Sequence, residues 1–230
     1  LEIAGINRLI TSISGIRDGL LFEYLARDTQ DPILPSVLMH SVDNLIHYYG
    51  IEGPHVRHVS NLALSLFDQL QSLHRLGAYE RRLLIVASLL HDIGYAVSHE
   101  NYFKHTFYMI LNARINGLTH RELVTIAFAA ASHERYYLEG VRDYLEPAGP
   151  LLPSDQRRIM LLAIILRLAK SLDRGRSGAV EGLRVEHGDE VIRLYLRARG
   201  KYMLELRSAM THKADWQAIL QRSLEIIGPA

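Results

Sequence analysis

The sequence predicts a mainly α-helical protein: a helical bundle followed by a small antiparallel β meander of three strands and a C-terminal helix. Two changes of period support this prediction. Apolar residues recur with the 3.6-residue period of amphipathic helices over residues 36–178. From residue 179, apolar and polar residues alternate through GLRVEHGDEVIRLYLRARGKYMLELRS, with turn residues at HGDE and RGK. The tail ADWQAILQRSLEII returns to a helical pattern.

Composition limits the classes of protein that this chain can represent. Its 230 residues are 48% hydrophobic and 22% charged, which is ordinary for a globular protein. The formal net charge is +1, so no overall field favours nucleic acid or an anionic membrane. The longest apolar runs have eight residues, too few to span a bilayer, and no signal peptide is visible. We therefore expect a cytoplasmic protein without a membrane partner.

Prolines separate the N-terminal segment from the rest of the sequence. A helix is expected after Gly15, and Pro32 and Pro35 then interrupt the chain. The chain begins with Leu1 rather than Met, which suggests a segment of a longer protein or a trimmed chain. Three parts are expected. Residues 1–35 form an N-terminal segment, and residues 36–178 form a helical bundle. Residues 179–230 form a meander with a C-terminal helix, packed on the bundle.

The first helices of the bundle carry clear start and stop signals. SVLMHSVDNLIHYYG ends in Gly50, a good C-cap, and Pro54 suits the first turn of the next helix. ERRLLIVASLLHDIG is apolar on most sides and stops at Gly94. This helix is therefore expected to be central and buried.

Three further helices complete the expected bundle. Thr119 and Glu122 have the spacing of a capping box, which predicts a helix through HRELVTIAFAAASHERYY. The apolar helix QRRIMLLAIILRLAKSLDRG follows the Pro- and Gly-rich loop EPAGPLLPSD. HTFYMILNARING is a shorter helix between the central helix and the capping box.

His91 and Asp92 stand side by side at the end of the central helix, in LLHDIG. Adjacent residues of a regular helix point about 100° apart, so both can face one metal ion only near a helix end. A carboxylate at a helix C-terminus is poorly placed against the helix dipole unless a cation lies nearby, and a divalent metal would supply that charge. A His-Asp pair also arises by chance, so the positions of the other candidate ligands decide whether this pair belongs to a metal site. Because cysteine is absent, those ligands must be histidine or carboxylate.

The remaining candidate ligands come from separate helices and mostly from helix ends, which suits a site at one end of a bundle. His55 lies in the first turn of its helix and shares the inward face with Val59. His58 is also near that face, and the sequence does not decide between the two; we prefer His55. The other candidates are His105, His133 and Asp173. For each of them alone, the ordinary alternative is a solvated or hydrogen-bonded residue.

Together these residues resemble the ligands of the HD-domain metal-dependent phosphohydrolases, which carry the pattern H…HD…D on an all-helical bundle. The matching residues are His55, His91, Asp92, His133 and Asp173. With His105 added, they resemble the subset that binds two metal ions. HVRHVSNLALSLFDQL, LLHDIGYAVS and KHTFYMILNARINGLTHRELVTIAF give a more specific match. They resemble the C-terminal region of the exopolyphosphatase and guanosine pentaphosphate phosphatase family, a resemblance that covers nearly the whole chain.

The resemblance implies a phosphohydrolase that uses a metal-activated water on a nucleotide or polyphosphate-like substrate. One or two divalent ions are implied, and Mn²⁺, Fe²⁺, Zn²⁺, Ni²⁺ or Co²⁺ suit imidazole and carboxylate ligands better than Mg²⁺. Asp92 would bridge two ions. The first ion would be held by His55, His91 and Asp173, and the second by His105 and His133. The cations near these ligands that could neutralise a substrate phosphate are Lys104, Lys170, Arg174 and Arg176.

Among these cations we expect Arg176 and Lys104, with Asp92, to take part in catalysis, and arginine fits bidentate phosphate contacts best. The equally good alternative for each cation is a solvated basic helix end. In the family, hydrolysis is assigned to N-terminal actin-like domains, whose phosphate-binding loops have no counterpart in residues 1–35. The alternative function is therefore a non-catalytic metal- or anion-binding and dimerising module. The presence of six candidate ligands favours the enzyme over the non-catalytic module.

Overall fold

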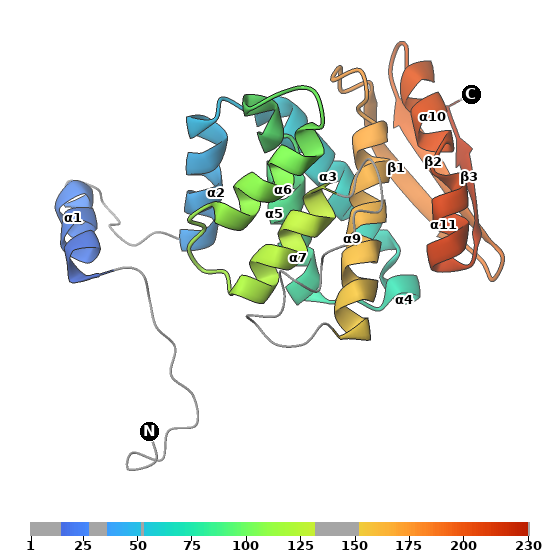
Figure 1. Ribbon diagram of the computed structural model, residues 1–230. Helices are drawn as coiled ribbons and strands as arrows, with labels where there is room; N and C mark the ends of the chain where they lie inside the picture. The colour runs from blue at the N-terminus through green and yellow to red at the C-terminus, as the bar shows by residue number, and fades with distance from the viewer. Residues whose placement is uncertain (1–14, 28–35, 52, 132–151, 230) are drawn as a thin grey trace. The chain divides into compact units, whose positions relative to one another are not determined.

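The computed structural model describes residues 15–27, 36–51, 53–131 and 152–229 (Figure 1). The chain divides into two compact units, Leu1–Val37 and Leu38–Ala230. In the first unit, α1 (Ile16–Ala26) begins with a cap in which the Gly15 N–H donates to the Asp18 carboxylate at 2.8 Å. Its exposed large apolar side chains are Ile16, Leu20, Leu21, Tyr24 and Leu25.

The second unit begins with a helical bundle and a short 3-10 turn, η2. In chain order these are α2 (Val37–Tyr48), α3 (Gly53–Gln69), α4 (Gln71–His74), α5 (Ala78–Leu90), η2 (Ile93–Ala96), α6 (Tyr102–Asn112), α7 (His120–Ala131) and α9 (Pro153–Ser171). Helix α5 packs against α3, α7 and α9, and every residue of α9 from Leu161 to Ser171 is buried. The apolar helices are thus the centre of the core, as their all-round hydrophobic pattern predicts.

The expected helix signals correspond to observed caps. Gly50 has a positive φ of 61°, which a glycine adopts without strain, and ends α2. The Thr119 N–H donates to the Glu122 carboxylate at 2.7 Å, and the Glu122 N–H donates back to the Thr119 hydroxyl at 3.3 Å. The capping box predicted at the start of α7 is therefore confirmed.

A three-stranded sheet follows the bundle, in the order β1-β2-β3. β1 (Val180–His187) and β2 (Val191–Ala198) form an antiparallel hairpin. β3 (Ser223–Ile227) pairs with β2 in parallel, and α10 (Met203–Met210) and α11 (Lys213–Leu220) form the crossover that a parallel pair requires (Figure 1). The prediction of a mainly α protein with a small three-stranded sheet and a C-terminal helix is confirmed.

The position and direction of the third strand differ from the expectation. Residues 203–208 form part of helix α10, and the strand comes instead from the end of the expected terminal helix. In α10 the buried residues are Glu205 and Ala209, four positions apart, whereas Met203 and Leu204 are more than half exposed. The alternation of apolar and polar residues in this segment therefore does not match the pattern of buried residues. The sheet is not a simple antiparallel meander, because β3 pairs with β2 in parallel.

Helix α11 anchors the C-terminal part to the bundle. It packs against α9 and β3, and its Trp216 is fully buried, with 0% exposure. His212, just before α11, lies with its Nε2 2.7 Å from the Ser171 hydroxyl at the end of α9. None of the described helices has the length and apolar content needed to cross a membrane.

The environment of His212 predicts acid-sensitive stability. Burial, assisted by the charge of Arg167, lowers the pKa of His212 to about 4, against about 6.5 in an unfolded chain. As the pH falls, the unfolded state therefore binds a proton before the folded state does. The contribution of neutral His212 to the free energy of unfolding is present above pH 6.5 and is lost as the pH falls towards 4. We expect the free energy of unfolding to drop by about 2 kcal/mol between pH 7 and pH 5 from this residue. Denaturant titrations at both pH values measure the drop, and His212→Gln should reduce it; an unchanged drop in the variant would contradict the assignment.

Candidate metal centre

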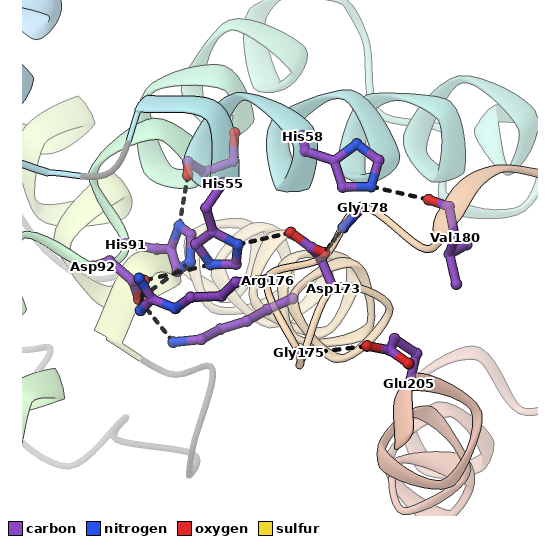
Figure 2. Close-up of polar contacts among 12 residues, drawn as sticks. His55, His58, His91, Asp92, Asp173, Gly175, Arg176, Gly178, Val180 and Glu205 are labelled. Atoms are coloured by element: carbon purple, nitrogen blue, oxygen red, sulfur yellow. Dashed lines mark hydrogen bonds and ion pairs between the residues drawn. The ribbon is translucent and has the colours of Figure 1, made fainter. Parts of the chain in front are cut away.

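Three of the expected metal ligands converge where the start of α3 meets the end of α5 (Figure 2). His55, His91 and Asp92 are buried, and one ligand atom from each lies within 4.8 Å of the others. The backbone explains how adjacent residues face the same point. His91 keeps helical geometry, whereas Asp92 leaves it, with φ −102° and ψ 5°. That change redirects the carboxylate towards the histidine rings.

Hydrogen bonds fix the ring orientation of both histidines. Nδ1 of His55 lies 2.7 Å from Oδ2 of Asp173, and Nδ1 of His91 lies 2.6 Å from the Ser88 carbonyl oxygen. A carboxylate and a carbonyl only accept, so both Nδ1 atoms carry hydrogen. In the neutral rings the Nε2 atoms therefore present lone pairs, 3.5 Å and 3.2 Å from the oxygens of Asp92. Nε2 of His55 forms no hydrogen bond with any residue that the structure describes.

The buried surroundings shift the pKa values of the three residues in different directions. Burial lowers the pKa of His55, but the hydrogen bond to Asp173 and the Asp92 carboxylate outweigh it, so the pKa ends above 6.5. Burial dominates for His91 and lowers its pKa to about 4. Burial raises the pKa of Asp92, yet His91, His55 and Lys170 together hold it far below its usual range. The surroundings thus favour a positive charge on His55 but disfavour one on His91.

Two cationic side chains already neutralise Asp92. Nζ of Lys170 lies 2.9 Å from Oδ1, and Nη2 of Arg176 lies 2.8 Å from Oδ2. Lys170 is 8% exposed and also donates to the Tyr102 hydroxyl at 2.8 Å, whereas the Arg176 side chain is 36% exposed. The carboxylate is therefore satisfied within the protein, and a metal ion would have to share it with these cations or displace them.

Asp173 lies on the far side of His55 from Asp92. Its Oδ2 accepts from His55 and its Oδ1 accepts from the Gly178 N–H at 2.9 Å. This arrangement orients the imidazole, as the outer carboxylate of a carboxylate–histidine–metal unit does. Asp173 is not part of the group of potential ligands formed by His55, His91 and Asp92.

The loop after α9 places Arg176 over the cluster. Arg176 has a positive φ of 51°, which is uncommon for a residue with a side chain. The preceding Gly175 donates its N–H to the Glu205 carboxylate on α10 at 3.1 Å, and Figure 2 shows this contact beside the cluster. Glu205 is only 2% exposed. The C-terminal part of the chain thus helps to set the position of Arg176.

A threonine that the sequence gives no reason to select holds the turn after Asp92. The Gly94 N–H donates to the Thr106 hydroxyl at 3.1 Å, and that hydroxyl donates to the His91 carbonyl at 3.2 Å. Thr106 is fully buried on α6, where the pattern alone predicts an ordinary core position. Close approach of α6 to η2 depends on Gly94, because a Cβ there would lie 2.0 Å from the Tyr102 carbonyl oxygen.

The other expected site residues do not join this cluster in the described structure. His105 is partly buried on α6 and is not part of the group of potential ligands. Lys104 is exposed, with its ammonium 6.0 Å from the Phe103 ring centroid. His133 lies outside the described residues. His58 instead bonds to the Val180 carbonyl at 2.9 Å, which ties α3 to β1.

A cavity of about 560 Å³ opens above the cluster. Asp92 and Arg176 form its polar part, and Tyr49, Tyr95 and His99 supply aromatic surface. Sites for small organic ligands usually have this size, with a few polar groups in an otherwise less polar wall. The cavity therefore offers room for a small ligand beside Asp92 and Arg176.

Fold and site together describe a mainly α-helical protein with a buried histidine–aspartate cluster at one end of its bundle. Residues 37–215 match Ppx/GppA phosphatase, domain III, so the chain belongs to the Ppx/GppA phosphatase family.

Three curated relatives that are similar to this chain share one name. Guanosine-5'-triphosphate,3'-diphosphate pyrophosphatase of Aeromonas hydrophila is 29% identical over 203 residues, which cover 85% of this chain and 38% of the relative. The protein of the same name from Aeromonas salmonicida is 28% identical over the same shares. That from Pseudoalteromonas translucida is 24% identical over 159 residues, 69% of this chain and 31% of the relative. The chain thus spans less than two fifths of the length of these relatives.

Proposed function

We propose that this chain is a metal-dependent phosphohydrolase of the HD type, related to exopolyphosphatases, that acts on a nucleotide or polyphosphate-like substrate. The observation that carries the proposal is the convergence of two imidazole Nε2 atoms and one carboxylate in a buried site below a cavity. The names of the relatives support a guanine nucleotide bearing several phosphates as the substrate class.

The donor set fits one transition-metal ion. His55, His91 and Asp92 would hold it, with Asp173 and the Ser88 carbonyl fixing the two rings. When bound, such an ion lowers the pKa of a coordinated water and supplies a hydroxide nucleophile near neutral pH. His105 and His133 would be the additional ligands of a second ion, although His105 is not part of the described cluster.

The protein's own cations would bind the substrate. Arg176 is partly exposed at the cavity, so its guanidinium can turn from Asp92 to a substrate phosphate and make a bidentate contact. Tyr95 lies under this guanidinium, 5.5 Å from ring centroid to Cζ, and stacks on Tyr102 with ring centroids 4.0 Å apart. The two rings thus lie against the guanidinium of Arg176 and the ammonium of Lys170.

Elemental analysis of the purified chain tests the proposal. We expect roughly one equivalent of a transition metal per chain, and a chelator should lower the melting temperature because a ligand that binds only the native state stabilises it. Asp92→Asn should lose the metal, whereas the matched surface variant Asp43→Asn should keep it, since Asp43 only pairs with Arg57 at 2.8 Å on the surface. No metal and an unchanged melting temperature in chelator would contradict the metal centre. Hydrolysis of a panel of nucleotides and polyphosphate that is equal in wild type and Asp92→Asn would contradict the enzyme.

A second candidate function is a non-catalytic metal- or anion-binding and dimerising module. The two ion pairs of Asp92 favour it, because they satisfy the carboxylate without a metal ion. A chain that lacks metal and hydrolytic activity but retains phosphate binding would support this function instead. Sedimentation velocity would then show whether the chain is a homodimer.

A further inference from the structure

A second pocket, of about 220 Å³, lies between the end of α9 and α10. The α9 side supplies three cationic side chains at intervals of three and four residues, Arg167, Lys170 and Arg174. The other side supplies hydroxyl groups and an imidazole, from Ser208, Thr211 and His212. Nearly all of these side chains are hydrogen-bond donors, and the volume is smaller than that of most sites for organic ligands.

The charges of this pocket are only partly balanced. Arg167 pairs with Asp215, and Lys170 pairs with Asp92 at 2.9 Å. Arg174 is exposed and forms no ion pair with a carboxylate in the described parts of the chain. Arg174 therefore gives the pocket a cation that pairs with no carboxylate of the described residues, beside neutral hydrogen-bond donors. This arrangement suits the recognition of an oxyanion.

The second pocket adjoins the metal centre through one residue. Lys170 lines the pocket, and its ammonium also contacts Asp92 and the Tyr102 hydroxyl. Tyr102 lines the same pocket and stacks on Tyr95 of the larger cavity. The two hollows are thus separated by Lys170 and the stacked tyrosines, and an anion in the smaller one would lie on the far side of Lys170 from Asp92.

We propose that the pocket between α9 and α10 binds a tetrahedral phosphate-class oxyanion, either inorganic phosphate or the terminal phosphate of an ester. Arg174 makes the principal charged contact, and Ser208 completes it through its hydroxyl group. Binding here needs neither the metal ion nor the hydrolytic activity proposed above. Failure of one proposal therefore leaves the other standing.

Calorimetric titration of the chelator-treated chain with inorganic phosphate tests this site. We expect saturable binding that weakens with salt, and Arg174→Gln should weaken it about tenfold or more, the usual effect of losing a charge-assisted contact. Ser208→Ala should produce a smaller loss. A parallel titration with phenyl phosphate distinguishes the sources: binding of both identifies a terminal phosphate group, and binding of inorganic phosphate alone identifies the free ion.

Two matched arginine variants decide where the anion binds. Arg193→Gln removes an exposed arginine that pairs with Glu225 on the sheet and should bind phosphate as the wild type does. Arg176→Gln measures instead any phosphate held at the larger cavity, because Arg176 faces that cavity. No phosphate binding by the wild type would overturn the proposal, as would binding lost in Arg176→Gln but kept in Arg174→Gln. Because Arg174 and Arg193 are exposed, both variants are expected to fold, and near-ultraviolet circular dichroism verifies this.

Discussion

Gly94→Ala is expected to lower the free energy of unfolding by about 3 kcal/mol or more. The added Cβ would lie 2.0 Å from the Tyr102 carbonyl oxygen and 2.5 Å from the Thr106 nitrogen. Both are backbone atoms of α6, so no change of rotamer can relieve the contact. The first turns of α6 must move away from η2, which breaks the bonds from Thr106 to Gly94 and to the His91 carbonyl.

Denaturant unfolding of Gly94→Ala and a control glycine variant measures this effect. Gly188→Ala is the control, because nothing lies within 4 Å of a Cβ built at that position in the hairpin turn. We expect the control to stay within about 0.5 kcal/mol of the wild type, as surface substitutions usually do. Equal stability of the two variants would show that α6 does not depend on close approach at Gly94. Metal content of a folded Gly94→Ala chain would report whether the His91–Asp92 turn has shifted.

Asp92→Ala is expected to destabilise the fold by about 3–5 kcal/mol, the usual result of removing one partner of a buried ion pair. Lys170 is the main reason, because its ammonium belongs to a side chain only 8% exposed and would lose its 2.9 Å ion pair with Asp92. Arg176 contributes less, because its partly exposed guanidinium can turn to solvent. Loss of Asp92 should therefore act mainly through the buried lysine.

A double-mutant cycle separates this effect from other consequences of the substitution. Asp92→Ala combined with Lys170→Met removes both buried charges and should recover much of the lost stability. Asp43→Ala, which breaks an exposed ion pair with Arg57, should change the free energy of unfolding by about 1 kcal/mol or less. If the double variant is as unstable as the sum of the single variants, the pair does not interact energetically. Denaturant titrations of the four proteins give the coupling free energy.

The helical part of the fold could be predicted because its signals are local. Gly50 and the pair Thr119–Glu122 mark helix ends through backbone geometry, and the apolar runs of α5 and α9 correspond to buried helices. The last 30 residues could not be assigned in the same way. In α10 the buried side chain at position 205 is a glutamate, while Met203 and Leu204 are exposed. Strand β3 has only five residues, and its parallel partner is more than 25 residues earlier in the sequence.

The cluster of His55, His91 and Asp92 could be inferred because all three lie near helix ends that a bundle brings together. Their role as ligands is still a prediction. The ion pairs of Asp92 could not be inferred in detail, since Lys170 and Arg176 are 78 and 84 positions away along the chain. Proximity in sequence favoured Lys104 as a further cation of the site, yet it lies exposed on α6 and has no described contact with the cluster. Which cation reaches the carboxylate is decided by the packing of α9 against the bundle.

The burial of Trp216 gives the chain an intrinsic optical reporter. It is the single tryptophan of the sequence, and it is fully enclosed where α11 packs near α9 and β3. Its fluorescence therefore responds to separation of the C-terminal helices from the bundle. Tyr95 and Tyr102 lie instead beside Asp92 and its cations. Emission excited at the red edge of the indole band would follow detachment of the C-terminal helices, while tyrosine absorbance in the near ultraviolet would report ligand binding at the cluster.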